Sequence, residues 1–339
     1  MRYLTCTVAA VAVAAFAGDA SARDQIRIVG SSTVFPFSTA VAEQFGVKTE
    51  YPTPVVESTG SGGGLKLFCA GVGVEHPDIT NASRAIKDSE IETCATNGVT
   101  EITEVKIGYD GIVLANDKAA PHAELTIPQI YLALAKDVPV DGEIVANPYT
   151  NWSEIDPSLP DEPIEVLGPP PTSGTRDAFV ELVMETGCEE FEEVTALDED
   201  RMGEVCATMR EDGRFVEAGE NDNLIVQKLQ ANPAAFGIFG FSYLDQNLDV
   251  IQGSAINGVA PEYDAIQTGE YPVSRSLYFY VKNAHVGVVP GIEEYVAEFT
   301  SEDAFGPDGY LADRGLIALP EDEREEVRER ATSFTPMGS

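Results

Sequence analysis

Three short polar motifs in this chain have the residue types that bind oxyanions. They are Gly30–Val34 (GSSTV), Ser58–Gly64 (STGSGGG) and Thr172–Arg176 (TSGTR). Each follows a strand-like run and precedes a helix-like run. Free backbone N–H groups and hydroxyls at a helix start attract anions, and glycine lets an oxyanion approach the backbone. A single hydroxyl in this position is usually only a helix cap, so the prediction depends on finding three such motifs in one chain.

Two arginines strengthen this interpretation. Arg84 directly follows a strand-like run, and Arg176 ends the third motif. The guanidinium fork suits bidentate contact with phosphate or sulfate. The alternative for each arginine is an ordinary salt bridge with one of the many acidic residues.

The elements that position these motifs alternate between strand and helix. Strand-like runs at Gln25–Gly30, Pro54–Ser58 and Asp78–Ala82 are each followed by a helix-like run, which is typical of a parallel sheet with helices on its faces. A second series follows the same logic, with helices at Ile127–Ala135, Gly174–Thr186 and Leu224–Gln230 and strands at Ile164–Leu167 and Phe236–Phe239.

Two longer strand-like runs, Val105–Asn116 and Val273–Val281, separate the two series. We therefore expect an α/β fold of two lobes, each with a parallel-sheet core, joined by two hinge strands around an interlobe cleft. The expected boundaries are 23–108 for the first part of lobe 1, 109–272 for lobe 2, and 273–339 for the hinge return and the second part of lobe 1. Segments 139–163 and 253–272 are expected to be surface loops, and 331–339 a frayed end.

Composition narrows the class of protein. The 339 residues include 21 Lys+Arg and 57 Asp+Glu, a formal net charge of −36. Such an acidic surface repels nucleic acid and anionic lipid, and excludes both as expected partners.

The N-terminus predicts a secretory signal peptide cleaved after Ala22, from Arg2, the apolar run Val8–Gly18 and the small residues Ala20–Ala22. A noncleaved anchor is the alternative. The chain is thus expected in the periplasm.

Four cysteines remain after residue 22, and their spacing favours local pairs over the other two connectivities. An oxidising compartment then predicts the disulfides Cys69–Cys94 and Cys188–Cys206. Close Cys-x₂-Cys pairs are absent from the sequence, so no zinc or other metal site is expected.

The sequence also lacks three common catalytic motifs, namely Gly-x-Ser-x-Gly, His-Glu-x-x-His and a Gly-Lys-Ser/Thr loop. We expect no cofactor and no enzyme; a secreted phosphatase is the alternative from another class.

The segments GSSTVFPF, ESTGSGGGLKLF, DITNASRAI and PPPTSGTRDAF resemble the PstS-like family of periplasmic phosphate-binding proteins. The resemblance covers nearly the whole chain after the signal segment. It implies a two-lobed type II binding-protein fold, a monomer that binds inorganic phosphate, and a membrane permease of an ABC importer as its partner. It also implies a set of ligand contacts in this chain, namely Thr33, Val34, Ser61, Ser173, Gly174 and Thr175.

Two positions depart from the family pattern. Arg84 stands where the best-known members have an aspartate that accepts the phosphate proton, and Pro169 stands where they have an arginine. We expect Arg84 to face the ligand and Arg176 to supply the charge instead. Asp110 is the predicted replacement acceptor, its alternative role being a turn aspartate before Gly111. Asp177 is a second candidate, expected to orient Arg176, and sulfate or arsenate is the alternative ligand.

Overall fold

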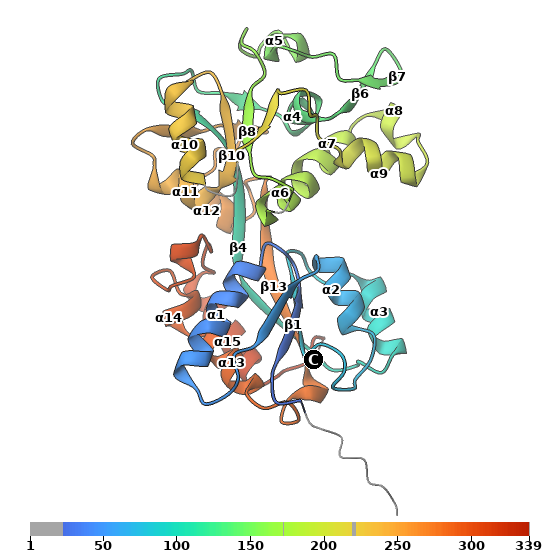
Figure 1. Ribbon diagram of the computed structural model, residues 1–339, viewed down its shortest axis with the longest axis vertical. Coiled ribbons are helices and arrows are strands. Elements are labelled where there is room, and N and C mark those ends of the chain that lie inside the picture. The colour runs from blue at the N-terminus through green and yellow to red at the C-terminus, as the bar shows by residue number, and fades with distance from the viewer. Residues whose placement is uncertain (1–22, 172, 219–221, 339) are drawn as a thin grey trace, which may run out of the picture.

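Two α/β lobes joined by two long strands make up the computed structural model, which describes residues 23–171, 173–218 and 222–338 (Figure 1). The connecting strands are β4 (Ile102–Asp117) and β13 (Ser274–Lys282). They pair antiparallel, from Gly111 opposite Ser274 to Ile102 opposite Lys282. The expected signal peptide, residues 1–22, lies outside the described residues, as does position 172 of the third motif. Among the described helices, none has the length and apolar character to cross a membrane.

Lobe 1 holds the first described residues and the chain's C-terminal helices. Its part of the sheet runs in the order β2-β1-β3-β13-β4, and β1 pairs parallel with both β2 and β3. The other elements of this lobe are β1 (Arg27–Gly30), β2 (Val55–Ser58), β3 (Ile79–Ala82), α1 (Phe35–Lys48), α2 (Ser61–Phe68), α3 (Asp88–Thr96), α13 (Ile292–Phe299), α14 (Glu302–Phe305) and α15 (Glu321–Thr332).

Lobe 2 continues the same sheet in the order β4-β10-β8-β9. β8 pairs parallel with β10 and β9, whereas β10 pairs antiparallel with β4. The strands of this lobe are β5 (Glu124–Leu125), β6 (Asp137–Val140), β7 (Glu143–Ala146), β8 (Val166–Gly168), β9 (Phe215–Glu217), β10 (Phe236–Gly240), β11 (Ile251–Gly253) and β12 (Ala255–Ile256). Its helices are α4 (Ile127–Leu134), α5 (Trp152–Ile155), α6 (Gly174–Phe179), α7 (Thr186–Cys188), α8 (Glu192–Thr195), α9 (Glu199–Ala207), α10 (Asp222–Ala231), α11 (Phe241–Gln246) and α12 (Tyr263–Gln267).

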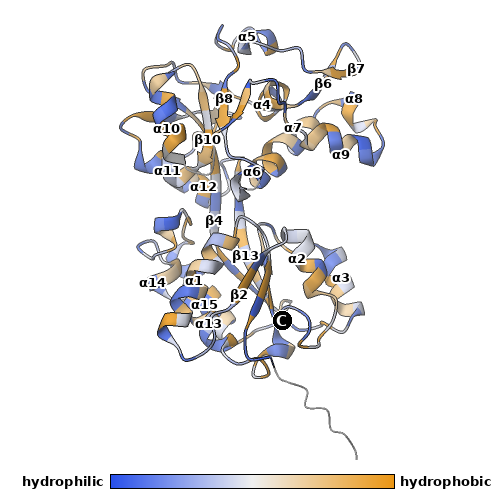
Figure 2. Cartoon of the chain, in the orientation of Figure 1, coloured by the Kyte–Doolittle hydropathy of each residue, from blue (hydrophilic) through white to orange (hydrophobic). Residues whose placement is uncertain are grey.

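Each lobe buries an apolar core between its strands and its helices, and both kinds of element contribute hydrophobic residues (Figure 2). Helix α1 shows how the sequence produces this arrangement. Phe37, Val41 and Phe45 recur at helical spacing and are all buried, while Pro36 occupies the first turn, where its missing N–H costs nothing. The expected α/β architecture is therefore confirmed, with antiparallel pairing where β4 and β13 cross between the lobes.

The segment expected to be one helix over Gly174–Thr186 is divided. It comprises α6, a π-helix over Val180–Glu185, and α7. Both expected disulfides are formed: Cys69–Cys94 joins the end of α2 to α3, and Cys188–Cys206 joins the end of α7 to α9. Each disulfide thus ties together helices of a single lobe.

The expectations for three irregular segments are wrong. Segment 139–163 carries β7 and α5, because Trp152 is fully buried against Phe236 with ring centroids 5.3 Å apart. Segment 253–272 likewise carries β12 and α12. The described part of 331–339 is packed rather than frayed: Asn283 donates to the carbonyl of Phe334 (2.8 Å), and Met337 N–H donates to the carbonyl of Ile102 (2.9 Å). These partners belong to β4 and the end of β13, which local sequence does not reveal.

Candidate functional site

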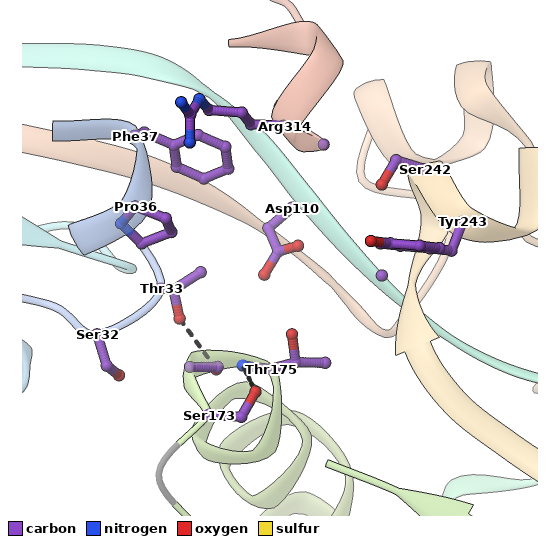
Figure 3. A pocket seen from close by; sticks show the side chains of 13 residues that line it. Ser32, Thr33, Pro36, Phe37, Asp110, Ser173, Thr175, Ser242, Tyr243 and Arg314 are labelled. Carbon is purple, nitrogen blue, oxygen red and sulfur yellow. Dashed lines mark hydrogen bonds between the residues drawn. The ribbon is translucent and has the colours of Figure 1, made fainter. Parts of the chain in front are cut away.

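A cavity of about 190 Å³ lies between the lobes, where the starts of α1 and α6 face one another (Figure 3). Lobe 1 contributes the turn before α1, including Ser32 and Thr33. Lobe 2 contributes the turn before α6, and β4 contributes Asp110. The carboxyl ends of β1 and β8 thus meet at one place, as expected for ligand sites of open α/β sheets.

The turn before α6 brings the third motif into the cavity. Ser173 caps the helix, its Oγ accepting from Thr175 N–H at 3.2 Å. Gly174 touches the other lobe: a Cβ at this position would lie 2.7 Å from the backbone nitrogen of Thr33. The Thr33 hydroxyl donates to the Gly174 carbonyl at 3.1 Å. The first and third motifs are therefore in direct contact across the cleft.

A second interlobe contact lies beside the first. The Ser32 hydroxyl donates to the Asp177 carboxylate at 2.5 Å. Asp177 was expected to orient Arg176, and its hydrogen-bond partner is instead this serine of the opposite lobe. The correction matters because Asp177 joins the lobes rather than adjusting an arginine within one of them.

Arg275 on β13 is the charged group behind the cavity wall. Its side chain is 7% exposed, and it donates to Thr33 Oγ at 2.5 Å and to Glu181 at 2.8 Å. Its Nε lies 3.7 Å from Asp110 Oδ2, too far for a hydrogen bond, and is buried with no hydrogen-bond partner. Asp110 therefore supplies the Nε group with a charge partner but not with a hydrogen bond, and a buried donor without a hydrogen bond is costly.

Asp110 is largely buried and lies between the turn before α6 and Arg314, which lines the cavity near the C-terminus (Figure 3). Burial raises the pKa of its carboxyl, and the Arg275 guanidinium partly offsets that rise. Because a carboxylate with a raised pKa is a stronger proton acceptor, Asp110 is suited to receive a hydrogen bond from a protonated oxyanion. Its position within β4 also excludes the alternative role as a turn residue.

The cavity brings together five of the nine residues expected to touch a ligand: Thr33, Asp110, Ser173, Gly174 and Thr175. The other four lie outside its lining. Val34 is fully buried in the core of lobe 1, and its N–H points to Ser31 Oγ at 3.4 Å. Ser61 exchanges hydrogen bonds with the side chain and backbone of Ser83 at 3.1 Å.

The two arginines expected in the cleft have other partners. Arg84 forms a bidentate pair with Glu90, with both contacts at 2.9 Å, and these hydrogen bonds raise the pKa of the arginine. Arg176 donates to the Pro169 carbonyl at 3.2 Å and lies over the Phe215 ring, 4.7 Å from its centroid. Burial there lowers the pKa of Arg176. Their charges are therefore already partnered within their own lobes.

Arg275 and one wall of the cavity, the fourth after lobe 1, the α6 turn and β4, are not predicted from the sequence. The wall consists of Ser242 and Tyr243 on α11 with Arg314 and Gly315 near the C-terminus. For Arg275 a signal was available, since it is the one charged residue in the strand-like run Val273–Val281. The fourth wall has no local signal, because only the folded chain brings these segments together.

Comparison with known proteins identifies the family and the fold of the chain. Residues 15–303 match the family model of the PBP superfamily domain. Protein SphX of Synechococcus elongatus is 33% identical over 81% of this chain and 73% of its own length. The phosphate-binding protein PstS of Staphylococcus saprophyticus is 28% identical over 89% of this chain and 82% of its own length.

Solved structures show the same fold. The crystal structure of a possible phosphate binding protein from Planctomyces limnophilus superposes with a TM-score of 0.74 at 29% identity, covering 93% of this chain and all of that one. An ABC-type phosphate transport receptor from Vibrio cholerae superposes with a TM-score of 0.60 at 20% identity, over 87% of this chain and all of that one. The chain therefore belongs to the PBP superfamily and resembles the PstS-like proteins within it.

Proposed function

We propose that this protein binds inorganic phosphate between its lobes and delivers it to the permease of an ABC importer. The observation that carries the proposal is the meeting of the first and third motifs at Thr33 and Gly174, in front of the partly unpartnered Arg275 guanidinium. Hydroxyls and backbone N–H groups from both lobes then replace the water around the ion. The names of the relatives, which include phosphate-binding proteins, support phosphate as the ion.

Asp110 is the group we propose to select phosphate over sulfate. Near neutral pH phosphate keeps at least one proton, whereas sulfate keeps none. A buried carboxylate accepts a hydrogen bond from the first and repels the second. Asp110 lines the cavity and has a raised pKa, so it fits this role in place of the aspartate that Arg84 displaces.

The proposed motion is a hinge between residues 23–108 with 273–339 on one side and residues 109–272 on the other. The pairing of β4 and β13 shifts register between Leu277 and Tyr278, which leaves Ile107 as an extra residue. This bulge lies next to the proposed boundary at residue 108. Bulges interrupt the ladder locally, so bending there breaks few hydrogen bonds.

We further propose that the protein is an exported monomer that performs no catalysis. PstS of Staphylococcus saprophyticus is a binding protein by name, and the similar structure from Vibrio cholerae is a transport receptor by name. The two disulfides suit an oxidising compartment, consistent with a signal peptide over residues 1–22 cleaved after Ala22.

Calorimetric titration of the protein from residue 23 onward tests the function. We expect one phosphate site that excess sulfate does not displace. Equal competition by sulfate would make this a general oxyanion-binding protein, and the absence of phosphate binding would refute the proposal.

A further inference from the structure

The cations described so far around the cavity do not offset the negative charges of the nearby carboxylates and of a bound anion. Asp110 and Asp177 lie at or beside the lining, and Glu181 pairs with Arg275 from the opposite lobe. Two of these carboxylates, Asp110 and Glu181, already pair with the one deep guanidinium, Arg275. Since Arg84 and Arg176 are occupied elsewhere, a further cation at the cavity would favour a bound dianion.

Arg314 is the cation that lines this cavity. It ends a short 3₁₀ turn, Ala312–Arg314, and is exposed to solvent. Its side chain makes no hydrogen bond or ion pair with the residues that the structure describes. Arg314 and Phe37 both line the cavity, and in the view of Figure 3 Asp110 lies between the Arg314 guanidinium and Thr175. In a chain with 57 acidic residues, an arginine without a carboxylate partner at a cleft is available to a ligand.

Two contacts fix the segment that carries Arg314. Ile317 and Tyr109 exchange backbone hydrogen bonds of 3.0 and 2.8 Å, which ties the segment to β4 directly beside Asp110. Gly315 has a φ of +98°, and a Cβ there would lie 2.8 Å from Ser242 Oγ of lobe 2. The base of the Arg314 side chain is therefore held at the point where the C-terminal segment meets the other lobe.

We propose that Arg314 is a ligand-facing cation, which covers the outer side of the bound phosphate and determines its affinity. The proposal rests on the phosphate-binding function proposed above. In it, Arg275 and the α6 turn hold the inner side of the ion, Asp110 accepts its proton, and Arg314 neutralises the oxygens that face solvent. The C-terminal segment thereby becomes part of the binding site.

Three variants test this. Arg314→Gln removes the charge, Arg314→Lys keeps it, and Arg330→Gln is the matched control. Arg330 is an equally exposed arginine on α15, where it lines a surface hollow with Glu323 and Glu326 away from the cavity. We expect Arg314→Gln to weaken phosphate binding about tenfold or more, since hydrogen bonds to charged groups are among the strongest available. Arg314→Lys should recover most of the loss, and Arg330→Gln should bind as the wild type does.

Salt provides a second readout that a merely structural role would not change. The difference in affinity between wild type and Arg314→Gln should shrink as ionic strength rises, because screening weakens a partly exposed charge contact. Loss of affinity without recovery in Arg314→Lys, or a difference that salt leaves unchanged, would overturn the proposal. Wild-type affinity in Arg314→Gln would overturn this inference alone, whereas a wild-type protein that binds no phosphate would overturn the proposed function with it.

Discussion

Gly174→Ala offers the sharpest test of closure around the cavity. An alanine Cβ would lie 2.7 Å from Thr33 N and 2.8 Å from both Ser32 C and Thr33 Cα. Carbon atoms in good contact are about 3.5–4.0 Å apart. These neighbours are backbone atoms of the opposite lobe, so they cannot rotate away as a side chain would.

The lobes can avoid the overlap only by separating. Overpacking of this kind costs about 1–3 kcal/mol, which corresponds to a loss of phosphate affinity of about 5- to 150-fold. Folding stability should change little, because the clash exists only between the lobes. Titration calorimetry measures the affinity, and small-angle scattering with phosphate should show a larger radius of gyration than for wild type.

Gly203→Ala is the matched control. Gly203 lies within α9, and a Cβ there would meet no atom within 4 Å. This change should leave phosphate affinity unchanged and stabilise the helix slightly. If Gly174→Ala bound phosphate as tightly as Gly203→Ala, the contact between the two motifs would not be part of the binding site.

Three further variants probe the charges. Arg275→Gln should reduce phosphate affinity about 100-fold in calorimetry, because it removes the cation that pairs with Asp110 and donates to Thr33; an unchanged affinity would contradict the site. Asp110→Asn should raise sulfate affinity relative to phosphate in competition titrations, since an amide donates to an unprotonated oxygen, and unchanged selectivity would remove Asp110 as the acceptor. Lys282 tests the fold, because burial lowers its pKa from 10.5 to about 8. Between these two pH values the unfolded chain binds more protons than the folded chain, so the free energy of unfolding rises with pH. Unfolding in denaturant should therefore show that wild type gains stability relative to Lys282→Met from pH 8 to pH 10; parallel curves would contradict the assigned shift.

Local sequence was sufficient to predict the turns that begin α1 and α6. Thr33 and Ser173 lie at strand-to-helix junctions, and such junctions are defined by hydrophobic periodicity and short polar motifs. The expectation of two lobes around a cleft also predicted that these two turns lie opposite each other. Asp110 was found the same way, as a carboxylate in the strand that crosses between the lobes.

Long-range pairing explains what the sequence did not reveal. Arg84 follows a strand, as expected. The chain then turns, so that the carboxylate of Glu90 in the first turn of α3 accepts hydrogen bonds from both terminal nitrogens of Arg84. Arg176 turns back to Pro169 because the aromatic ring of Phe215 provides a face for its guanidinium. Position along the chain identified both arginines as polar groups near the cleft, and only tertiary contacts decided which way they point.

The placement of Arg275 explains how so acidic a chain can hold an anion. Long-range attraction is absent at a net charge of −36, so the site must depend on fixed donors at short range. Arg275 reaches Thr33 within lobe 1 and Glu181 on the π-helix of lobe 2, and the contact with Glu181 persists only while the lobes are together. The same guanidinium thus stabilises closure and donates a hydrogen bond to Thr33, which lines the cavity. An ion that attracts Arg275 also strengthens the group that joins the lobes, which couples binding to closure without any further moving part.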